Sequence, residues 1–252
     1  MNILLVTPMP PRAEAAGAIP LVLQGALVGL LERHDVTLIT AAGDEPGERD
    51  AVASLTRAGL DIRAVDTRQP QGVARWRRRI RLASTWLGTP YPWRTVWFAD
   101  PGFQHQIDTA ARARAYDIYV VHDSALAVFR PPTGVATVVT EHEVQPDPPG
   151  ATGLSLHTLD GRRWRGFQTS AWRRFDGIEV FTQRDAEAVS AIAADLSERV
   201  YVDPFGIVLP KPVDTKLQEP GLVLFVGNFT HPPNVDAALW LAEEIAPRVR
   251  RE

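Results

Sequence analysis

The chain has 252 residues, of which 45% are hydrophobic and 23% are charged, and its formal net charge is -3. This length allows one full domain and part of another, and the near-neutral charge does not favour a dedicated nucleic-acid binder. Because the chain contains no cysteine, disulfide scaffolds, thiolate metal sites and cysteine nucleophiles are excluded.

Short apolar runs alternate with helical stretches from the first residue. Asn2–Thr7 is continuously apolar at its centre, which is typical of a strand buried on both faces of a parallel sheet. Leucine and isoleucine then recur at helical spacing between residues 19 and 31. Strands separated by helices predict an α/β domain with a doubly wound, parallel, Rossmann-like sheet. Further elements are expected at Asp35–Thr40, Glu48–Ala58 (a helix), Asp61–Val65, Asp117–Val121, Val135–Thr140, Gly177–Thr182 and Arg199–Val202.

A proline-rich polar stretch at 204–221 interrupts this alternation and predicts a linker after a first domain of residues 1–203. One strand at Leu222–Val226 and one helix capped by Asn234 are expected after it. A single strand and helix cannot cover both faces of a parallel sheet. Residues 222–252 are therefore interpreted as the first βα unit of a truncated second Rossmann-like domain.

Polar side chains follow two of the predicted strands at their carboxyl ends, where a doubly wound sheet binds its ligands. His122 and Asp123 follow one strand, and Glu141 and His142 follow the next. Carboxylates beside an imidazole hold its orientation and bias its proton. We therefore favour a functional role for His142, in acid–base chemistry or in contacting sugar hydroxyls. For His122 and Asp123, a purely structural role in the loops is an equal alternative.

Gly17 directly precedes the first predicted helix. A glycine at this position lets backbone amides approach a phosphate at the positive end of the helix. The sequence contains no G-x-G-x-x-G fingerprint, P-loop, nucleophile elbow or metal-spaced carboxylate set. Binding of a dinucleotide cofactor is therefore not predicted.

Two segments combine arginine with tryptophan. In Val73–Gly88 the apolar residues recur on one helical face and arginines surround it, which fits an interfacial helix attracted to anionic lipid. A core-facing stripe with a solvated rim is an equal alternative there, and it is the favoured interpretation of Arg162–Phe175. The sequence has no signal-peptide pattern and no stretch of about 18 apolar residues. A cytoplasmic location is expected, with peripheral contact at the inner membrane face left open.

Five segments carry a resemblance to a known family. They are "MNILLVTPMPP…AGAIPLVLQGALVGLLERHDVTLIT", "VATVVTEHEVQ", "FDGIEVFTQRDAEAV", "VDPFGIVLP" and "LVLFVGNFTHPPNVDAALWLAEEIAPRV". In this order they resemble the N-terminal domain and the start of the C-terminal domain of family-four glycosyltransferases, which have the GT-B fold. The resemblance implies an acceptor domain and a nucleotide-sugar domain facing a cleft. It also implies transfer of a sugar with retention of configuration and without a bound metal.

The resemblance also implies roles for single residues. His142 matches the catalytic histidine that faces the transferred sugar, and Gly17 matches the glycine loop beside the donor diphosphate. Gly227 and Asn228 match the loop after the first strand of the donor domain, where the donor binds. His122, Asp123 and Glu141 are expected to bind substrate. The expected partners are a nucleotide-sugar donor and a glycan or lipid-linked acceptor, with no cofactor, no metal and no nucleic acid.

The sequence departs from the family at two points. Pro204, Phe205 and Gly206 stand where the family has a proline–asparagine–glycine turn. The basic pair that clamps the donor phosphates, and two glutamates with seven residues between them, belong to a stretch that this sequence lacks. The sequence therefore predicts a retaining glycosyltransferase that has little or no activity as this stretch alone. The alternative is a non-catalytic binding or partner domain of the same fold. The pairs Glu179 and Glu187, and Glu244 and Glu252, have the right spacing but lie in the wrong elements and are assigned no role.

Overall fold

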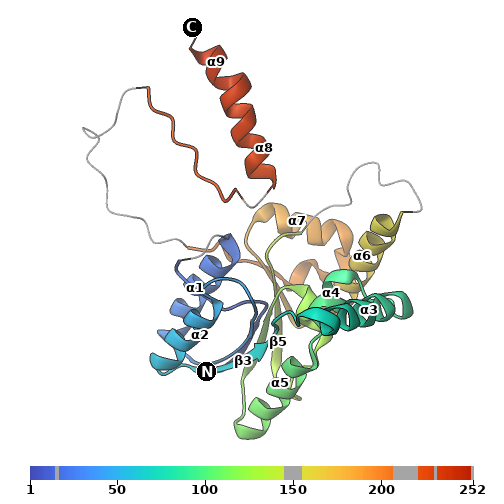
Figure 1. The fold of residues 1–252 in the computed structure, drawn as a ribbon. Helices are drawn as coiled ribbons and strands as arrows, with labels where there is room; N and C mark the ends of the chain where they lie inside the picture. The colour runs from blue at the N-terminus through green and yellow to red at the C-terminus, as the bar shows by residue number, and fades with distance from the viewer. Residues whose placement is uncertain (15–16, 145–154, 207–220, 230–231, 251–252) are drawn as a thin grey trace. The chain divides into compact units, whose positions relative to one another are not determined.

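A computed structural model describes residues 1–14, 17–144, 155–206, 221–229 and 232–250 (Figure 1). The chain divides into two compact units. The first unit comprises Met1–Ala15 and Ile19–Gly206, and the second comprises Ala16–Ala18 and Ile207–Glu252.

The described part of the first unit contains a seven-stranded sheet in the order β3-β2-β1-β4-β5-β6-β7. Every neighbouring pair of strands is parallel. The strand order reverses at β1, which pairs with β2 on one side and with β4 on the other. Open α/β sheets bind their ligands at such a reversal. The predicted Rossmann-like sheet is confirmed. Its strands are β1 (Asn2–Thr7), β2 (Asp35–Ala42), β3 (Asp61–Asp66), β4 (Ile118–His122), β5 (Ala136–Glu141), β6 (Gly177–Val180) and β7 (Val200–Val202).

Helices cover the sheet from both sides (Figure 1). Alternate residues of β1 point to opposite faces, so Ile3 packs with Leu27 of the first helix on one face and Leu4 joins Phe103 and Trp172 in the larger core on the other. This burial on both faces explains the continuous apolar run in the sequence. The helices are α1 (Ala18–Leu31), α2 (Glu48–Arg57), α3 (Gly72–Gly88), α4 (Trp93–Phe98), α5 (Pro101–Ala113), α6 (Leu156–Arg174) and α7 (Gln183–Ile192), with 3₁₀ turns η1 (Ser124–Val128) and η2 (Ala194–Arg199).

Side-chain caps fix where helices begin near the carboxyl edge of the sheet. Thr182 caps α7, because its hydroxyl accepts a hydrogen bond from the Asp185 N–H at 3.1 Å. The Asp185 carboxylate in turn accepts from the Val144 N–H at 3.1 Å. The loop that follows β5 is therefore tied to the start of α7, which positions the residues between Glu141 and Val144.

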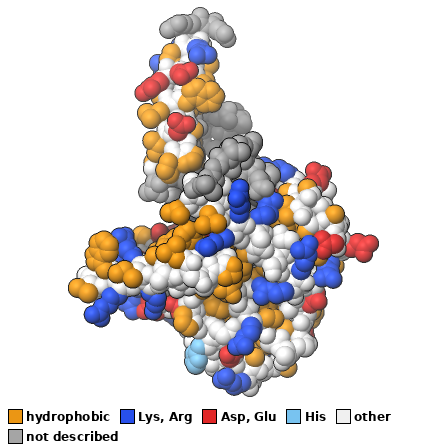
Figure 2. Space-filling view, turned by 90° about the vertical axis from the view of Figure 1, so that its right-hand side faces the viewer, with side chains coloured by type: hydrophobic (Ala, Val, Ile, Leu, Met, Phe, Trp, Pro, Cys, Tyr) orange, Lys and Arg blue, Asp and Glu red, His pale blue; other side chains and the backbone are white. Residues whose placement is uncertain are grey.

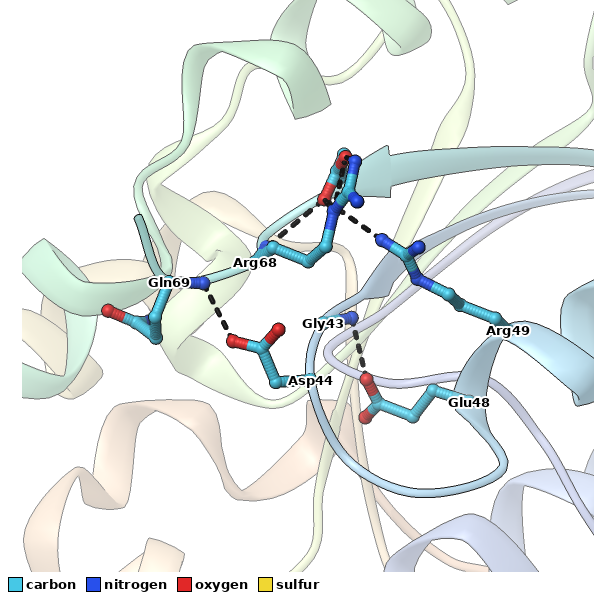
Figure 3. A network of polar contacts seen from close by, with 7 residues as sticks. Gly43, Asp44, Glu48, Arg49, Arg68 and Gln69 are labelled. Atoms are coloured by element: carbon cyan, nitrogen blue, oxygen red, sulfur yellow. Dashed lines mark hydrogen bonds and ion pairs between the residues drawn. The ribbon is translucent and has the colours of Figure 1, made fainter. Parts of the chain in front are cut away.

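Polar contacts also join the loops that follow β2 and β3 (Figure 3). The Asp44 carboxylate accepts from the Gln69 N–H at 2.7 Å, and the Glu48 carboxylate accepts from the Gly43 N–H at 2.6 Å. Both contacts satisfy backbone donors beyond the strand ends, and the contact between Asp44 and Gln69 holds the two loops together. The same network contains Arg49, Asp66 and Arg68.

The two arginine–tryptophan segments form α3 and most of α6, and they differ in how they pack. In α6, Ala171 and Phe175 at its C-cap belong to the core, which confirms the core-facing interpretation for the end of that segment, whereas Trp164 and Phe167 are half-buried. α3 instead buries Leu82 and Trp86, and the predicted apolar stripe lies on its solvent-facing side. Among the described helices, each is too short or too polar to span a bilayer.

In the second unit, residues 221–229 adopt neither helix nor strand, so the predicted strand at Leu222–Val226 is wrong. A strand needs a neighbour to pair its N–H and C=O groups, and the described residues of this unit offer none. The predicted linker at 204–221 lies largely at 207–220, outside the described residues.

The helix of the second unit begins earlier than expected. α8 (Pro232–Trp240) continues through a π-helical turn at Leu241–Ile245 into α9 (Ala246–Val249). Asn234 therefore lies inside the helix instead of capping it, and its side chain donates to the Asn228 carbonyl oxygen at 3.0 Å. Proline at the first helical positions needs no N–H partner, which allows this earlier start. None of the described residues of this helix is buried.

Candidate functional site

Polar side chains gather where β4 and β5 end. His122 ends β4 and pairs in register with Thr140, so the two strands reach the edge of the sheet together. Here a small hollow of 170 Å³, called the pocket below, opens beside the reversal of strand order. The structure thus brings together several residues that the sequence placed at strand ends. The pocket is lined by Ile19, Arg94, Asp123, Glu141, His142, Glu143 and Trp164.

Asp123 has an unusual backbone. Its φ of 82° makes it the one non-glycine among the described residues with a positive φ, and such a conformation is strained for a residue with a side chain. Three contacts hold it in place. Its N–H donates to the Thr140 carbonyl oxygen at 2.8 Å, its carboxylate accepts from the Ala125 N–H at 2.9 Å, and the same carboxylate forms an ion pair with Arg94. Asp123 therefore caps η1 and fixes Arg94 at the pocket.

Glu141 is a buried carboxyl at the end of β5. Its Oε1 accepts from the Trp172 indole Nε1 at 2.6 Å and from the Ser124 hydroxyl. Burial, together with the nearby charge of Asp123, raises the pKa of Glu141 to about 7 against the hydrogen bonds that favour the ionised form. Glu141 therefore titrates near neutral pH inside the pocket wall.

Two histidines lie next to each other beside these carboxylates. The rings of His122 and His142 are 5.4 Å apart. Burial lowers the pKa of both, that of His122 to about 3 with a further contribution from His142. The Asp123 charge opposes the shift of His142, and the Arg94 charge adds to it. Both imidazoles are therefore neutral near pH 7.

Each imidazole also keeps one unsatisfied nitrogen. Nδ1 of His122 and Nε2 of His142 are buried and have no hydrogen-bond partner among the described residues. Buried polar atoms are rarely left unpaired, because the lost hydrogen bond to water is not replaced. The two nitrogens are therefore candidates for contact with a bound molecule.

His122 lines a second, larger hollow of 640 Å³ on the sheet face that also carries α1. Phe181 and Phe205 line it too, and their rings are 5.5 Å apart. The His142 ring lies 5.4 Å from Phe181, so it stands between the two hollows. His122 thus lines the larger hollow and not the pocket, although its ring adjoins His142.

Arg94 and Trp164 are pocket residues that sequence reasoning missed. The Arg94 guanidinium lies 5.3 Å from the centre of the Trp164 ring, which favours a cation–π contact. Trp164 belongs to the segment Arg162–Phe175, for which the sequence favours a core-facing stripe, but it is half-buried at the pocket edge. Arg94 lies 29 residues before Asp123 in a short helix without a motif, so no signal in the sequence marks it.

Gly17, Gly227 and Asn228, which the sequence assigned to donor binding, do not line the pocket. Gly17 is exposed in the bend directly before α1, whose first-turn residue Ile19 lines the pocket. Gly17, Gly227 and Asn228 all belong to the second unit, whereas the pocket is built from the first unit. Among the described residues, no group of three histidine, aspartate or glutamate side chains converges in a way that could hold a metal ion.

Comparisons with known proteins give fold-level similarities. No protein-family model matches the sequence, and no curated protein is significantly similar to it. The N-terminal domain of trehalose-6-phosphate phosphatase from Candida albicans is similar over 77% of this chain and 43% of that chain, at 16% identity and a TM-score of 0.44. A UGT transferase from Siraitia grosvenorii in complex with UDP is similar over 81% and 48%, at 14% identity and a TM-score of 0.39.

A third similar structure is trehalose-6-phosphate from E. coli bound with UDP-2-fluoro glucose, over 82% of this chain and 49% of that chain, at 15% identity and a TM-score of 0.38. The chain spans less than half of each of these three proteins. Similarities of this size assign the chain to no family and carry no argument about its activity.

Proposed function

We propose that this chain forms the acceptor-side part of a glycosyltransferase that moves a sugar from a nucleotide-sugar donor to a glycan or lipid-linked acceptor. The observation that carries the proposal is the pocket, where the first turn of α1 and His142 meet at the carboxyl edge of the sheet. The sequence resemblance to family-four glycosyltransferases supports the same reaction and implies retention of configuration.

His142 is the residue that we assign to the reacting sugar. Its lowered pKa keeps the imidazole neutral, and the unpaired Nε2 has a free hydrogen-bonding position. A neutral imidazole can accept a hydrogen bond from a sugar hydroxyl or donate one to it, depending on its tautomer. His142 would thereby orient the transferred sugar while the anomeric carbon gains positive charge.

The first turn of α1 is the element that we assign to the donor phosphates. Backbone N–H groups at a helix N-terminus attract anions, and Gly17 directly before α1 would let a phosphate come close. Negative charge develops on the leaving phosphate during transfer, and donors placed beforehand stabilise that charge. Gly227 and Asn228 belong to the second unit, and their role in binding the donor stays a prediction from the resemblance.

Asp123 and Glu141 line the pocket, but their oxygens already accept hydrogen bonds from within the protein. We therefore propose that these two carboxyls chiefly position other groups. Asp123 holds Arg94, and Glu141 holds the end of β5 from which His142 projects. His122 would support the His142 ring from the other side.

Ligand binding tests this proposal without requiring turnover. Saturation-transfer NMR with a panel of nucleotide sugars and lipid-phosphate sugars should identify a ligand of the whole chain. His142→Ala should weaken its binding by about 10-fold, because one hydrogen bond to the ligand is lost. His105→Ala removes an exposed histidine of α5 and should leave binding unchanged. The proposal is wrong if no member of the panel binds or if both variants bind like the wild type.

A second candidate function is a non-catalytic partner domain. Leu222, Val223, Leu224 and Val226 of the second unit are 68–82% exposed, which is unusual for apolar side chains that lie together in sequence. A partner protein that covers them would explain this exposure. The two candidates differ in what the chain binds, because sugar transfer requires a small-molecule ligand at the pocket and a partner domain does not.

A further inference from the structure

α3 carries an apolar stripe that faces solvent. Val73, Trp76, Ile80 and Leu87 are 65–70% exposed, and their spacing places them on one side of the helix. This set is called the α3 stripe below. Figure 2 views the molecule from the side on which α3 and α6 lie in Figure 1, and it shows hydrophobic side chains gathered next to basic ones.

Arginines flank the α3 stripe. At 100° per residue, Arg77 and Arg81 fall on one side of it and Arg79 falls on the other. The Arg79 guanidinium lies 5.7 Å from the centre of the Trp76 ring, and Arg77 and Arg81 are exposed. The sequence contains no aspartate or glutamate between Asp66 and Asp100. The segment that carries the α3 stripe is therefore basic, and its own side chains place no negative charge beside the stripe.

The opposite side of α3 is anchored to the rest of the first unit. Leu82 and Trp86 are buried there with Val96 of α4. The Trp86 indole Nε1 donates to the Asp160 carboxylate of α6 at 2.6 Å, and the Arg163 guanidinium lies 4.8 Å from the centre of the Trp86 ring. These contacts fix the rotation of α3, so the α3 stripe points outward as a rigid feature.

We propose that α3 docks this protein on an anionic membrane surface. Trp76 and Ile80 would enter the interface between headgroups and acyl chains, and the flanking arginines would lie at the level of the lipid phosphates. A second copy of the chain is a poorer occupant, because pairing two α3 stripes would bring arginine rows of like charge together. α4 follows α3 and carries Arg94 of the pocket, so docking would bring the pocket near the lipid surface.

Vesicle sedimentation of the whole chain tests the proposal, and its outcome does not depend on the proposed sugar transfer. The chain should sediment with vesicles of phosphatidylcholine and phosphatidylglycerol at low salt, and much less with phosphatidylcholine alone. The double variant Arg77→Ser, Arg81→Ser should bind about 25-fold more weakly, at about 5-fold per basic residue. The double variant Trp76→Ser, Ile80→Ser should bind at least about 10-fold more weakly.

Matched controls remove two exposed arginines, or two exposed apolar side chains, from other helices of the first unit. Arg112→Ser with Arg184→Ser removes two exposed arginines of α5 and α7, and Val28→Ser with Leu31→Ser removes two exposed apolar residues of α1. Both controls should bind vesicles like the wild type. On the wild type itself, hydrogen exchange of residues 73–87 should slow when anionic vesicles are added.

Three results would overturn the proposal. The first is a wild type that does not sediment with anionic vesicles. The second is equal loss of binding in a control and its α3 counterpart, which would indicate general charge or apolarity instead of α3. The third is a wild-type dimer in solution that Ile80→Ser dissociates, which would show that a second copy covers the α3 stripe.

Discussion

Glu141 ends β5 as a buried carboxyl whose pKa is raised from 4.5 to about 7, mainly by burial. Between these two pH values the folded protein keeps a proton that the unfolded chain has released. The stability that this proton provides is fully present below about pH 4.5 and is lost as the pH rises through about 7. Ionisation of Glu141 should therefore lower the free energy of unfolding by about 3 kcal/mol across that window, as measured by urea denaturation.

Glu141→Gln separates this effect from the other titrating groups. The glutamine amide oxygen can accept from both the Trp172 indole and the Ser124 hydroxyl, as Oε1 of Glu141 does, but the amide has no proton to lose. The difference in unfolding free energy between the two proteins should change steadily from about pH 4.5 to about 7. A constant difference would contradict the raised pKa of Glu141.

Asp123 gives a second prediction, about backbone strain. Asp123→Ala removes the cap of η1 but keeps a side chain at a φ of 82°, whereas Asp123→Gly removes the cap and also relieves the strain. The glycine variant should be more stable than the alanine variant by about 1 kcal/mol in chemical denaturation. Asp123→Asn keeps an acceptor oxygen for the cap and should stay nearest to the wild type. Equal stability of the alanine and glycine variants would show that the backbone is unstrained.

The sequence predicted some of the pocket residues and missed others for a definable reason. Asp123, Glu141 and His142 were found because polar residues directly follow apolar strands, and parallel strands end at one edge. Arg94 and Trp164 come from helices whose positions depend on tertiary packing, and nothing in their local sequence reports that packing. The same limit applies to Trp172 and Ser124, which set the environment of Glu141 from two different elements.

Among the elements, the attachment of α3 and α4 to α6 gives a sharp prediction. One oxygen of Asp160 accepts from the Trp86 indole Nε1 at 2.6 Å and from the Trp93 N–H at 2.7 Å. Asp160→Ala leaves both donors unpaired, which should cost about 2 kcal/mol of stability and speed hydrogen exchange in α3 and α4. Asp160→Asn retains an acceptor oxygen and should restore both measurements. Slow exchange in the alanine variant would show that apolar packing alone holds α3.

Strands and long helices could be predicted from the sequence, because each has a characteristic spacing of apolar residues. β1 forms over Asn2–Thr7 as predicted, since burial on both faces requires a continuous apolar run. α3 was located correctly, but which of its faces is buried was not predicted. Its apolar residues are distributed around much of the helix, so only the contacts with α4 and α6 show that Leu82 and Trp86 point inward. The expected strand at Leu222–Val226 is absent, because an apolar run forms a strand only where a second strand pairs with its backbone.

At the scale of the whole molecule, the topology of the first unit followed from two general rules. Alternating strands and helices require a parallel sheet, and right-handed crossovers then limit the order in which the strands can pair. The order β3-β2-β1-β4-β5-β6-β7 places the reversal at β1, and the pocket opens beside it. The described helix of the second unit has no buried residue. Its apolar pattern therefore predicts a buried face that the described residues of this unit do not provide.

The exposed residues of the second unit support a last prediction. Leu224 is 81% exposed and Leu239 is 52% exposed, and burying such side chains is favourable by about 1.5–3 kcal/mol each. At high concentration the chain should therefore self-associate in size-exclusion chromatography coupled to light scattering. Leu224→Ser with Leu239→Ser should reduce this association, because both contributions are lost. The matched control Leu21→Ser with Val28→Ser changes exposed residues of the first unit and should not. A wild type that remains monomeric would argue against the partner-domain function. If both double variants reduced self-association equally, the contact between the copies would lie outside the second unit.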